Sequence, residues 1–133
     1  MKKIIMVVMA VALVGCAAQT SPQRHAKNFA MHAEETLNGN MRTDRNGMYQ
    51  QVLPQFNEIY AQGKAERVKG ASELEAKAYA DAVRKEAQKQ NTVASHFNGS
   101  PQVVEKEDAS LKDSVLWYNN LADTFLDGYN NVL

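Results

Sequence analysis

The chain has 133 residues, of which 15 are basic and 15 acidic, and it contains one cysteine. This length allows one small domain with a single core. The balanced charge gives no electrostatic reason to expect nucleic-acid binding, and a lone cysteine excludes an intrachain disulfide.

The N-terminal segment carries the strongest signal in the sequence. Lys2 and Lys3 precede an unbroken apolar run over residues 4–14. That run is too short to span a bilayer as a helix and is typical of an export signal. The expected organisation is a lipoprotein signal peptide over 1–15, a lipidated cysteine and short tether over 16–21, and a helical domain over 22–133.

The apolar run closes with Leu13-Val14-Gly15-Cys16, which resembles the lipobox of bacterial lipoproteins. The resemblance implies that Leu13, Val14 and Gly15 are recognised by the signal peptidase. It also implies that Cys16 is the lipidation site, carrying diacylglycerol and an N-acyl chain such as palmitate. Two or more chains anchor a protein firmly to a membrane. Because Ala17 rather than aspartate follows Cys16, the resemblance implies a lipid anchor in the outer membrane, with the side of that membrane left open.

Two helices are expected in the first half of the domain. Ser21 and Pro22 form a typical helix start, and Asn38-Gly39-Asn40 would end that helix. A second helix should begin near Gln50, because Pro54 is tolerated only in a first turn. Gly63 lies inside this helix at a cost of about 1 kcal/mol relative to alanine, and Gly70 would cap its end.

The second half predicts two more helices. Ser72 and Glu75 form a capping box that opens an alanine-rich helix, in which Leu74, Tyr79 and Val83 belong to the apolar stripe. The break at 98–101 separates this helix from a last one over 103–130. No segment shows a convincing strand pattern. The fold class is therefore all-α, a small bundle of about four helices arranged as two helical hairpins.

No catalytic or metal site is expected. His25 and His32 lie seven residues apart on one helix face, and a third ligand from Glu35 or His96 would require a coincidence of the fold. Charged residues on the third helix form a solvated surface with weak ion pairs rather than an acid–base site. These residues are Glu73, Glu75, Lys77, Asp81, Arg84, Lys85, Glu86 and Lys89. The chain is thus expected to be no enzyme, with no metal and no cofactor apart from the covalent lipid on Cys16.

The last helix concentrates aromatic and acidic side chains. Trp117, Tyr118, Phe125 and Tyr129 are expected to lie in the core, with a partner-binding surface as the alternative. From residue 99 onward the chain carries two basic and six acidic residues, which indicates a solvated face or a docking face for a basic partner.

The whole chain resembles the plasmid entry-exclusion lipoproteins. The resemblance rests on the lipobox, the tether Ala17-Ala18-Gln19 and the segment 60–80. It implies a membrane-anchored, non-enzymatic lipoprotein that excludes incoming plasmids at the cell envelope. The alternative is a structural, self-associating outer-membrane lipoprotein that supports the envelope. The expected partners are the bilayer, through Cys16, and an envelope protein or a second copy, through the C-terminal helix, with no nucleic acid.

Overall fold

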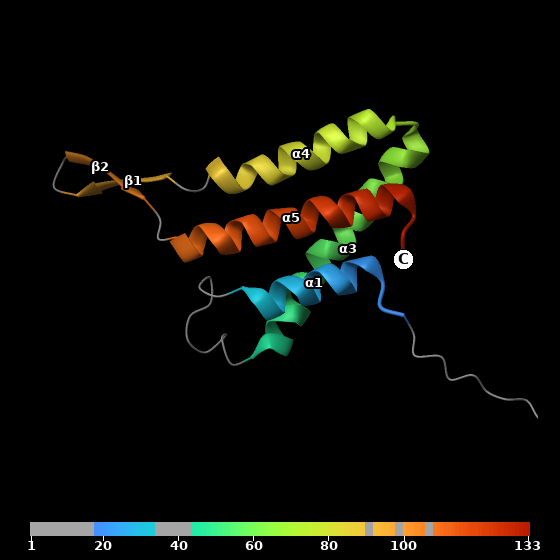
Figure 1. Ribbon diagram of the computed structural model, residues 1–133, viewed down its shortest axis with the longest axis horizontal. Coiled ribbons are helices and arrows are strands. Elements are labelled where there is room, and N and C mark those ends of the chain that lie inside the picture. Colours follow the sequence, from blue (N-terminus) through green and yellow to red (C-terminus); the bar gives the residue numbers. More distant parts are fainter. Residues whose placement is uncertain (1–17, 34–43, 90–91, 98–99, 106–107) are drawn as a thin grey trace, which may run out of the picture.

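The computed structural model describes residues 18–33, 44–89, 92–97, 100–105 and 108–133 (Figure 1). The helices are α1 (Ser21–His32), α3 (Arg45–Lys69), α4 (Glu73–Lys89) and α5 (Asp108–Asn130). Two strands, β1 (Thr92–Phe97) and β2 (Ser100–Glu105), lie between α4 and α5 in the sequence. The prediction of a small all-α bundle is confirmed for these helices.

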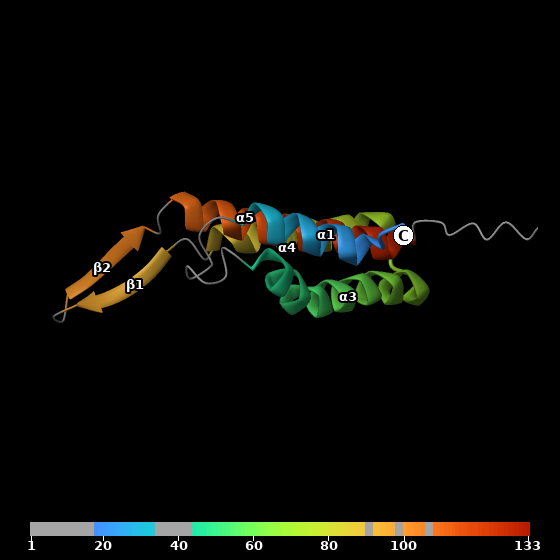
Figure 2. The ribbon, with the colours of Figure 1, turned by 90° about the horizontal axis from the view of Figure 1, so that it is seen from below.

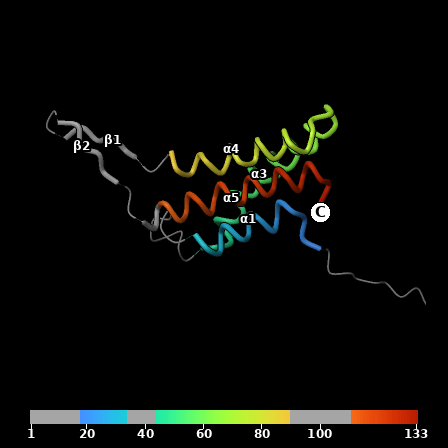
Figure 3. The backbone as a smooth tube through the Cα atoms, turned by 45° about the horizontal axis from the view of Figure 1, so that its top comes forward, coloured from blue at the N-terminus to red at the C-terminus, as the bar shows by residue number. Residues whose placement is uncertain are grey.

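Helix α5 is the centre of the bundle. It lies between α1 and α4, and it also packs along α3 (Figure 1). Figure 2 shows α1, α5 and α4 in one layer, with α3 as a second layer across it. The tube in Figure 3 shows the same crossing of α3 behind α5. Helix α5 therefore contacts each of the other helices that the structure describes, α1, α3 and α4.

Helix α1 starts and ends at positions that the sequence did not predict. Thr20, not Ser21, is the N-cap, and its amide donates to Gln23 Oε1 at 3.0 Å. The Ser21 hydroxyl instead donates to Asp127 Oδ2 on α5 at 2.7 Å, so it is not available as a cap. The described helix ends at His32 rather than near residue 38, because Ala33 is extended, with a ψ of 129°. The expected stop at 38–40 lies outside the described residues.

Arg45 at the start of α3 supplies a reason for this early end. Its Nη1 donates to the carbonyl oxygens of Ala30 at 2.9 Å and Ala33 at 2.6 Å. Carbonyls in the last turn of a helix have no partner within the helix and need donors from elsewhere. A guanidinium from α3 therefore caps the end of α1 that the structure describes.

The predicted start of the second helix near Gln50 is wrong. Helix α3 begins at Arg45, with Asp44 as N-cap accepting from the Gly47 amide at 2.7 Å, and Pro54 lies inside it. Proline removes the hydrogen bond to the carbonyl four residues earlier. Gln50 and Pro54 are both exposed, so the carbonyl left without its helical partner lies where water can solvate it. The predicted end at Gly70 is confirmed, with a positive φ of 91°.

Helix α4 has the predicted capping box. The Ser72 amide donates to Glu75 Oε2 at 2.7 Å, and the Glu75 amide donates to Ser72 Oγ at 3.3 Å. Its predicted stripe is partly wrong, because Leu74 is 77% exposed. The face that packs on α5 consists mainly of small residues, Ala76, Ala80 and Ala87. Alanine at these positions lets the two helix backbones approach closely, which leaves Leu74 on the opposite face.

The strand pair contradicts the expectation that no strand forms. Strands β1 and β2 are antiparallel, with Thr92 opposite Glu105 and Phe97 opposite Ser100. Helix α5 accordingly starts at Asp108 rather than near residue 103. The missed signal is the dipeptide Asn98-Gly99 between two short runs, which is the strongest short-range sequence indication of a two-residue hairpin connection.

The core has two parts. In the first, Trp117 meets Phe29 and Phe56 edge to face, with ring centroids 4.7 Å and 5.2 Å apart. Phe56 is fully buried. In the second, Phe125 and Tyr129 of α5 pack with Ala76 of α4. The prediction that these aromatic residues of the last helix belong to the core is therefore confirmed.

Two glycines set the distance between α3 and α5. A Cβ added at Gly63 would lie 2.1 Å from the carbonyl oxygen of Phe125. A Cβ added at Gly128 would lie 2.1 Å from the carbonyl oxygen of Tyr60. Both distances are far inside van der Waals contact, and both involve backbone that cannot rotate away. Gly63 is thus required where α3 crosses α5, which explains a residue that otherwise weakens a helix.

Candidate functional site

A polar cluster joins α1 to α5 around the carboxylate of Asp127. Asp127 Oδ2 accepts from Ser21 Oγ at 2.7 Å and lies 3.1 Å from His25 Nε2. Arg24 Nη2 lies 3.4 Å from the same oxygen. Asp127 is therefore the shared acceptor of three side chains from the first two turns of α1.

Asn120, two turns earlier on α5, extends this cluster. Its Nδ2 donates to the Leu116 carbonyl at 2.8 Å, which fixes the orientation of the amide. Its Oδ1 accepts from Asn28 Nδ2 at 3.2 Å and lies 3.2 Å from His25 Nδ1. Both ring nitrogens of His25 therefore face side-chain oxygens of α5.

Ser21, His25 and Asp127 are the residue types of a hydrolytic triad, but their arrangement in space differs from that of a triad. In a triad the histidine lies between the serine and the aspartate, so that it can take the hydroxyl proton. Here the aspartate lies between them, and Ser21 donates directly to it. Ser21 is also completely buried. This arrangement can fix α1 on α5, but it does not activate a nucleophile.

Loss of Asp127 should loosen α1 more than loss of a matched acidic residue. We expect Asp127→Ala to lower the free energy of unfolding by about 1.5–3 kcal/mol, because it leaves part-buried donors without their acceptor. The control is Asp123→Ala on the same helix, whose half-exposed ion pair with Arg84 should be worth less than about 1 kcal/mol. Urea unfolding followed by circular dichroism measures both, and equal losses would contradict the role given to the cluster.

The histidines do not come together as ligands. His32 Nδ1 lies 2.8 Å from the Asn28 carbonyl oxygen of its own helix, whereas His25 faces α5. Within the described ranges, no group of three histidine, cysteine, aspartate or glutamate side chains could hold a metal ion. Glu35 and the side chain of His96 lie outside the described residues. The expectation of no metal and no catalytic residue stays a prediction.

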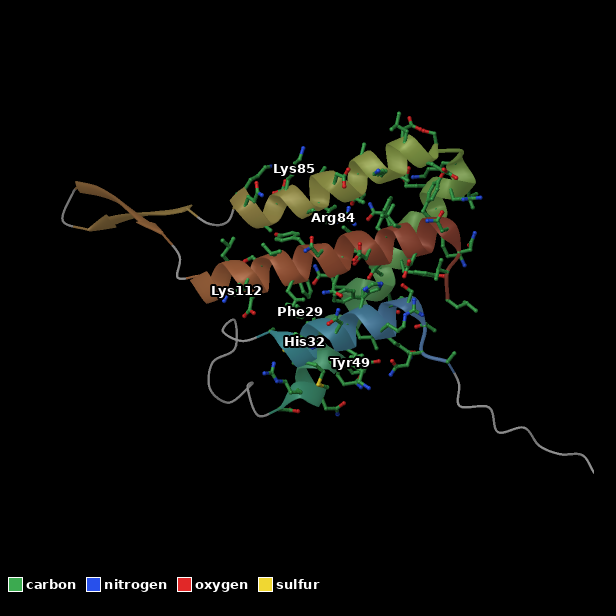
Figure 4. The ribbon with its side chains drawn as sticks, viewed as in Figure 1. Phe29, His32, Tyr49, Arg84, Lys85 and Lys112 are labelled. Atoms are coloured by element: carbon green, nitrogen blue, oxygen red, sulfur yellow. The ribbon has the colours of Figure 1, made fainter. Side chains whose placement is uncertain are left out.

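The charged residues of α4 form surface ion pairs, as the sequence indicates. Arg84 Nη1 lies 2.8 Å from Asp81 and Nη2 lies 2.6 Å from Asp123 of α5. Lys89 Nζ lies 2.5 Å from Glu86. Figure 4 shows Arg84 directed from α4 toward α5, whereas Lys85 points away from the bundle. The Arg84 bridge links two helices, while the other contacts connect neighbouring turns.

A surface cleft of about 340 Å³ opens where α3, α4 and α5 meet. It is lined by Gln62, Glu66, Ala71, Glu75, Ala76, Tyr79 and Phe125. The rings of Tyr79 and Phe125 lie 4.3 Å apart at 38°, and the Tyr79 hydroxyl donates to Gln62 Oε1 at 3.3 Å. We call this site the α3–α4 cleft. It combines an aromatic wall with two carboxylates, and sequence periodicity could not have placed these residues together.

The α3–α4 cleft keeps its negative charge in mildly acidic solution. Hydrogen bonds from the Ser72 amide and hydroxyl hold the pKa of Glu75 below its ordinary value of 4.5. The two Ser72 contacts use Oε2, at 2.7 Å and 2.8 Å. Among the contacts of the described residues none uses Oε1, so this oxygen can accept from a ligand.

The four residues of the expected lipidation motif, Leu13, Val14, Gly15 and Cys16, lie outside the described residues. Lipidation of Cys16, its diacylglycerol and N-acyl chain, and the placement in an outer membrane therefore stay predictions. Within the part of the chain that the structure describes, no helix is both long enough and apolar enough to cross a membrane. A partner for the C-terminal helix also stays a prediction, although Phe125 and Tyr129 are used inside the bundle.

Comparison with known proteins gives one result. The model of the gastrin/cholecystokinin family matches residues 2–108. No curated protein and no solved structure matches the chain. The family match covers most of the chain and ends at the first residue of α5, so it includes α1, α3 and α4 but not the central helix.

This match overturns the resemblance to plasmid entry-exclusion lipoproteins. The interpretation as a membrane-anchored envelope lipoprotein is wrong, both as an exclusion protein and as a structural, self-associating one. The physical reason lies in the segment 60–80 on which the resemblance depended. That segment is the end of α3, the left-handed Gly70 and the Ser72 capping box. These are general signals of a helix–turn–helix connection, so they carry no information on function.

Proposed function

Because the chain belongs to the gastrin/cholecystokinin family, a family of peptide hormones, we propose that it is an exported signalling protein that acts by binding a partner protein. It does so as an intact helical domain and without catalysis. The observation that carries this proposal is the family match over residues 2–108, which includes the apolar N-terminal segment typical of an export signal.

The packing of α5 supports an intact domain rather than a short peptide as the active form. Helix α5 lies outside the family match, yet Phe125 and Tyr129 complete the core against α4. The Tyr129 hydroxyl donates to the Ala71 carbonyl at 2.7 Å, which ties the end of α5 to the α3–α4 turn. A peptide cut from any one helix would lose these contacts, and most of the stability of a helix in a protein comes from such tertiary packing.

The geometry of the polar cluster supports a non-catalytic role. Ser21, His25 and Asp127 form a Ser–His–Asp grouping with Asp127, not His25, at its centre. Among the described residues that line the α3–α4 cleft there is likewise no histidine, serine or cysteine. What these surfaces offer is shape and charge for binding.

The test is saturable binding to cells of the organism that encodes the protein. The labelled full chain should bind these cells and be displaced by unlabelled chain. Synthetic peptides covering 21–32, 45–69, 73–89 and 108–130 should fail to displace it, because none of them reproduces the folded surface. Export is checked by recovering the protein outside the producing cells. Displacement by one peptide at the same concentration as the full chain, or the absence of saturable binding, would refute the proposal.

A further inference from the structure

The α3–α4 cleft has one sign of charge. Glu66 and Glu75 lie on two different helices and both line the cleft, and none of the described residues that line it is basic. Lys69 Nζ on α3 lies 2.7 Å from Glu66 Oε1, but the lysine side chain is 69% exposed. An exposed pair of this kind contributes little free energy, so a ligand can displace the lysine.

The wall of this cleft suits a flat cation. Tyr79 is 38% exposed, its ring lies at 38° to that of Phe125, and both residues line the cleft. A guanidinium lies favourably over an aromatic ring and donates from a planar fork to carboxylates. The protein already makes such a contact nearby, where the Arg67 guanidinium lies 5.1 Å from the centroid of the Tyr129 ring.

We propose that the α3–α4 cleft binds an arginine side chain of a partner protein. The guanidinium stacks on Tyr79 and donates to the carboxylates of Glu66 and Glu75, while Ala71 and Ala76 contact the aliphatic stem. The volume of about 340 Å³ admits one long side chain. This inference rests on the proposed function in one respect, namely that a partner protein supplies the arginine.

Arginine fits this site better than lysine for a geometric reason. The two carboxylates belong to different helices, and a planar fork with five donors can reach both while its face stays on the ring. The ammonium of lysine is a compact, strongly hydrated charge that gains less from an aromatic surface. The lowered pKa of Glu75 lets its carboxylate stay charged at a lower pH than an ordinary glutamate.

The experiment is a titration of the full chain with three blocked tripeptides, followed by NMR at low salt and pH 7. The probes are Gly-Arg-Gly, Gly-Lys-Gly and Gly-citrulline-Gly, where citrulline has nearly the shape of arginine without its charge. We expect the arginine peptide to bind with a Kd on the order of 1 mM and to shift the signals of Ala71, Ala76 and Tyr79. The lysine peptide should bind at least threefold more weakly and the citrulline peptide should not bind.

Three variants locate the binding. Glu66→Gln, Glu75→Gln and Tyr79→Leu should each weaken the arginine peptide at least fivefold. Glutamine keeps the capping box at position 75, so that variant should retain the fold. The matched control is Glu86→Gln, since Glu86 also lies on α4 but outside the cleft and pairs with Lys89. Its affinity for the peptide should be unchanged.

Three outcomes would overturn the inference: no shift at 50-fold the expected Kd, equal binding of the citrulline or lysine peptide, or equal weakening by Glu86→Gln. The peptide titration needs only the folded chain. Cell binding that persists while the peptide fails would therefore overturn the arginine site and leave the proposed function standing. Peptide binding without cell binding would overturn the proposed function and leave the arginine site standing.

Discussion

We expect Gly63→Ala to lower the free energy of unfolding by about 3 kcal/mol, at the upper end of what overpacking costs. The added methyl group would lie 2.1 Å from the Phe125 carbonyl oxygen and 2.8 Å from the Tyr129 amide nitrogen. Both atoms belong to the backbone of α5, so no side chain can rotate to make room. Helices α3 and α5 must separate, which opens the core around Phe125. Guanidinium unfolding followed by circular dichroism measures the loss.

The sign of this effect makes the prediction decisive. In an uncrowded helix, glycine to alanine stabilises by about 1 kcal/mol. Ala65→Gly, at an exposed position two residues further along α3, calibrates this helix-propensity effect and should cost about 1 kcal/mol. A more stable Gly63→Ala protein would show that α3 and α5 do not approach as described. Gly128→Ala, which meets the Tyr60 carbonyl from the other helix, should repeat the loss.

We expect Phe56→Ala to cost about 3–5 kcal/mol, the usual range for removing a buried phenylalanine. Phe56 is fully buried, and its ring meets the edge of Trp117, which also contacts Phe29. The substitution leaves a cavity where α1, α3 and α5 meet. Since small domains are stable by only about 5–15 kcal/mol, this single change could remove much of the total. Denaturant unfolding monitored by Trp117 fluorescence gives the free energy directly, because Trp117 is the single tryptophan of the chain.

The control for Phe56→Ala is Val68→Ala on the same helix. Val68 is 87% exposed, so its loss should change stability by no more than about 0.5 kcal/mol. Comparable losses at the two positions would contradict the core described for α3. The Phe56→Ala protein also serves the function test, because a destabilised domain should lose cell binding if the folded surface is the active form.

Local signals in the sequence determined the helical class and two of the helix boundaries. The Ser72–Glu75 capping box and the left-handed Gly70 act within one turn, so their residues alone decide where α4 starts and α3 ends. The core position of Phe125 was also expected from the sequence. The lipidation motif at Cys16 was read from sequence alone and lies outside the described residues.

Only the tertiary structure decided the other boundaries and the candidate sites. Arg45 ends α1 from a different helix, and Asp127 draws the Ser21 hydroxyl away from capping. The α3–α4 cleft combines residues from α3, α4 and α5, and the need for Gly63 comes from the backbone of α5. Each of these depends on contacts between residues far apart in the chain. A periodic pattern specifies which face of a helix is apolar, but not which helix packs on that face or how closely the two helices approach. The polar cluster and the cleft both depend on this pairing and this distance.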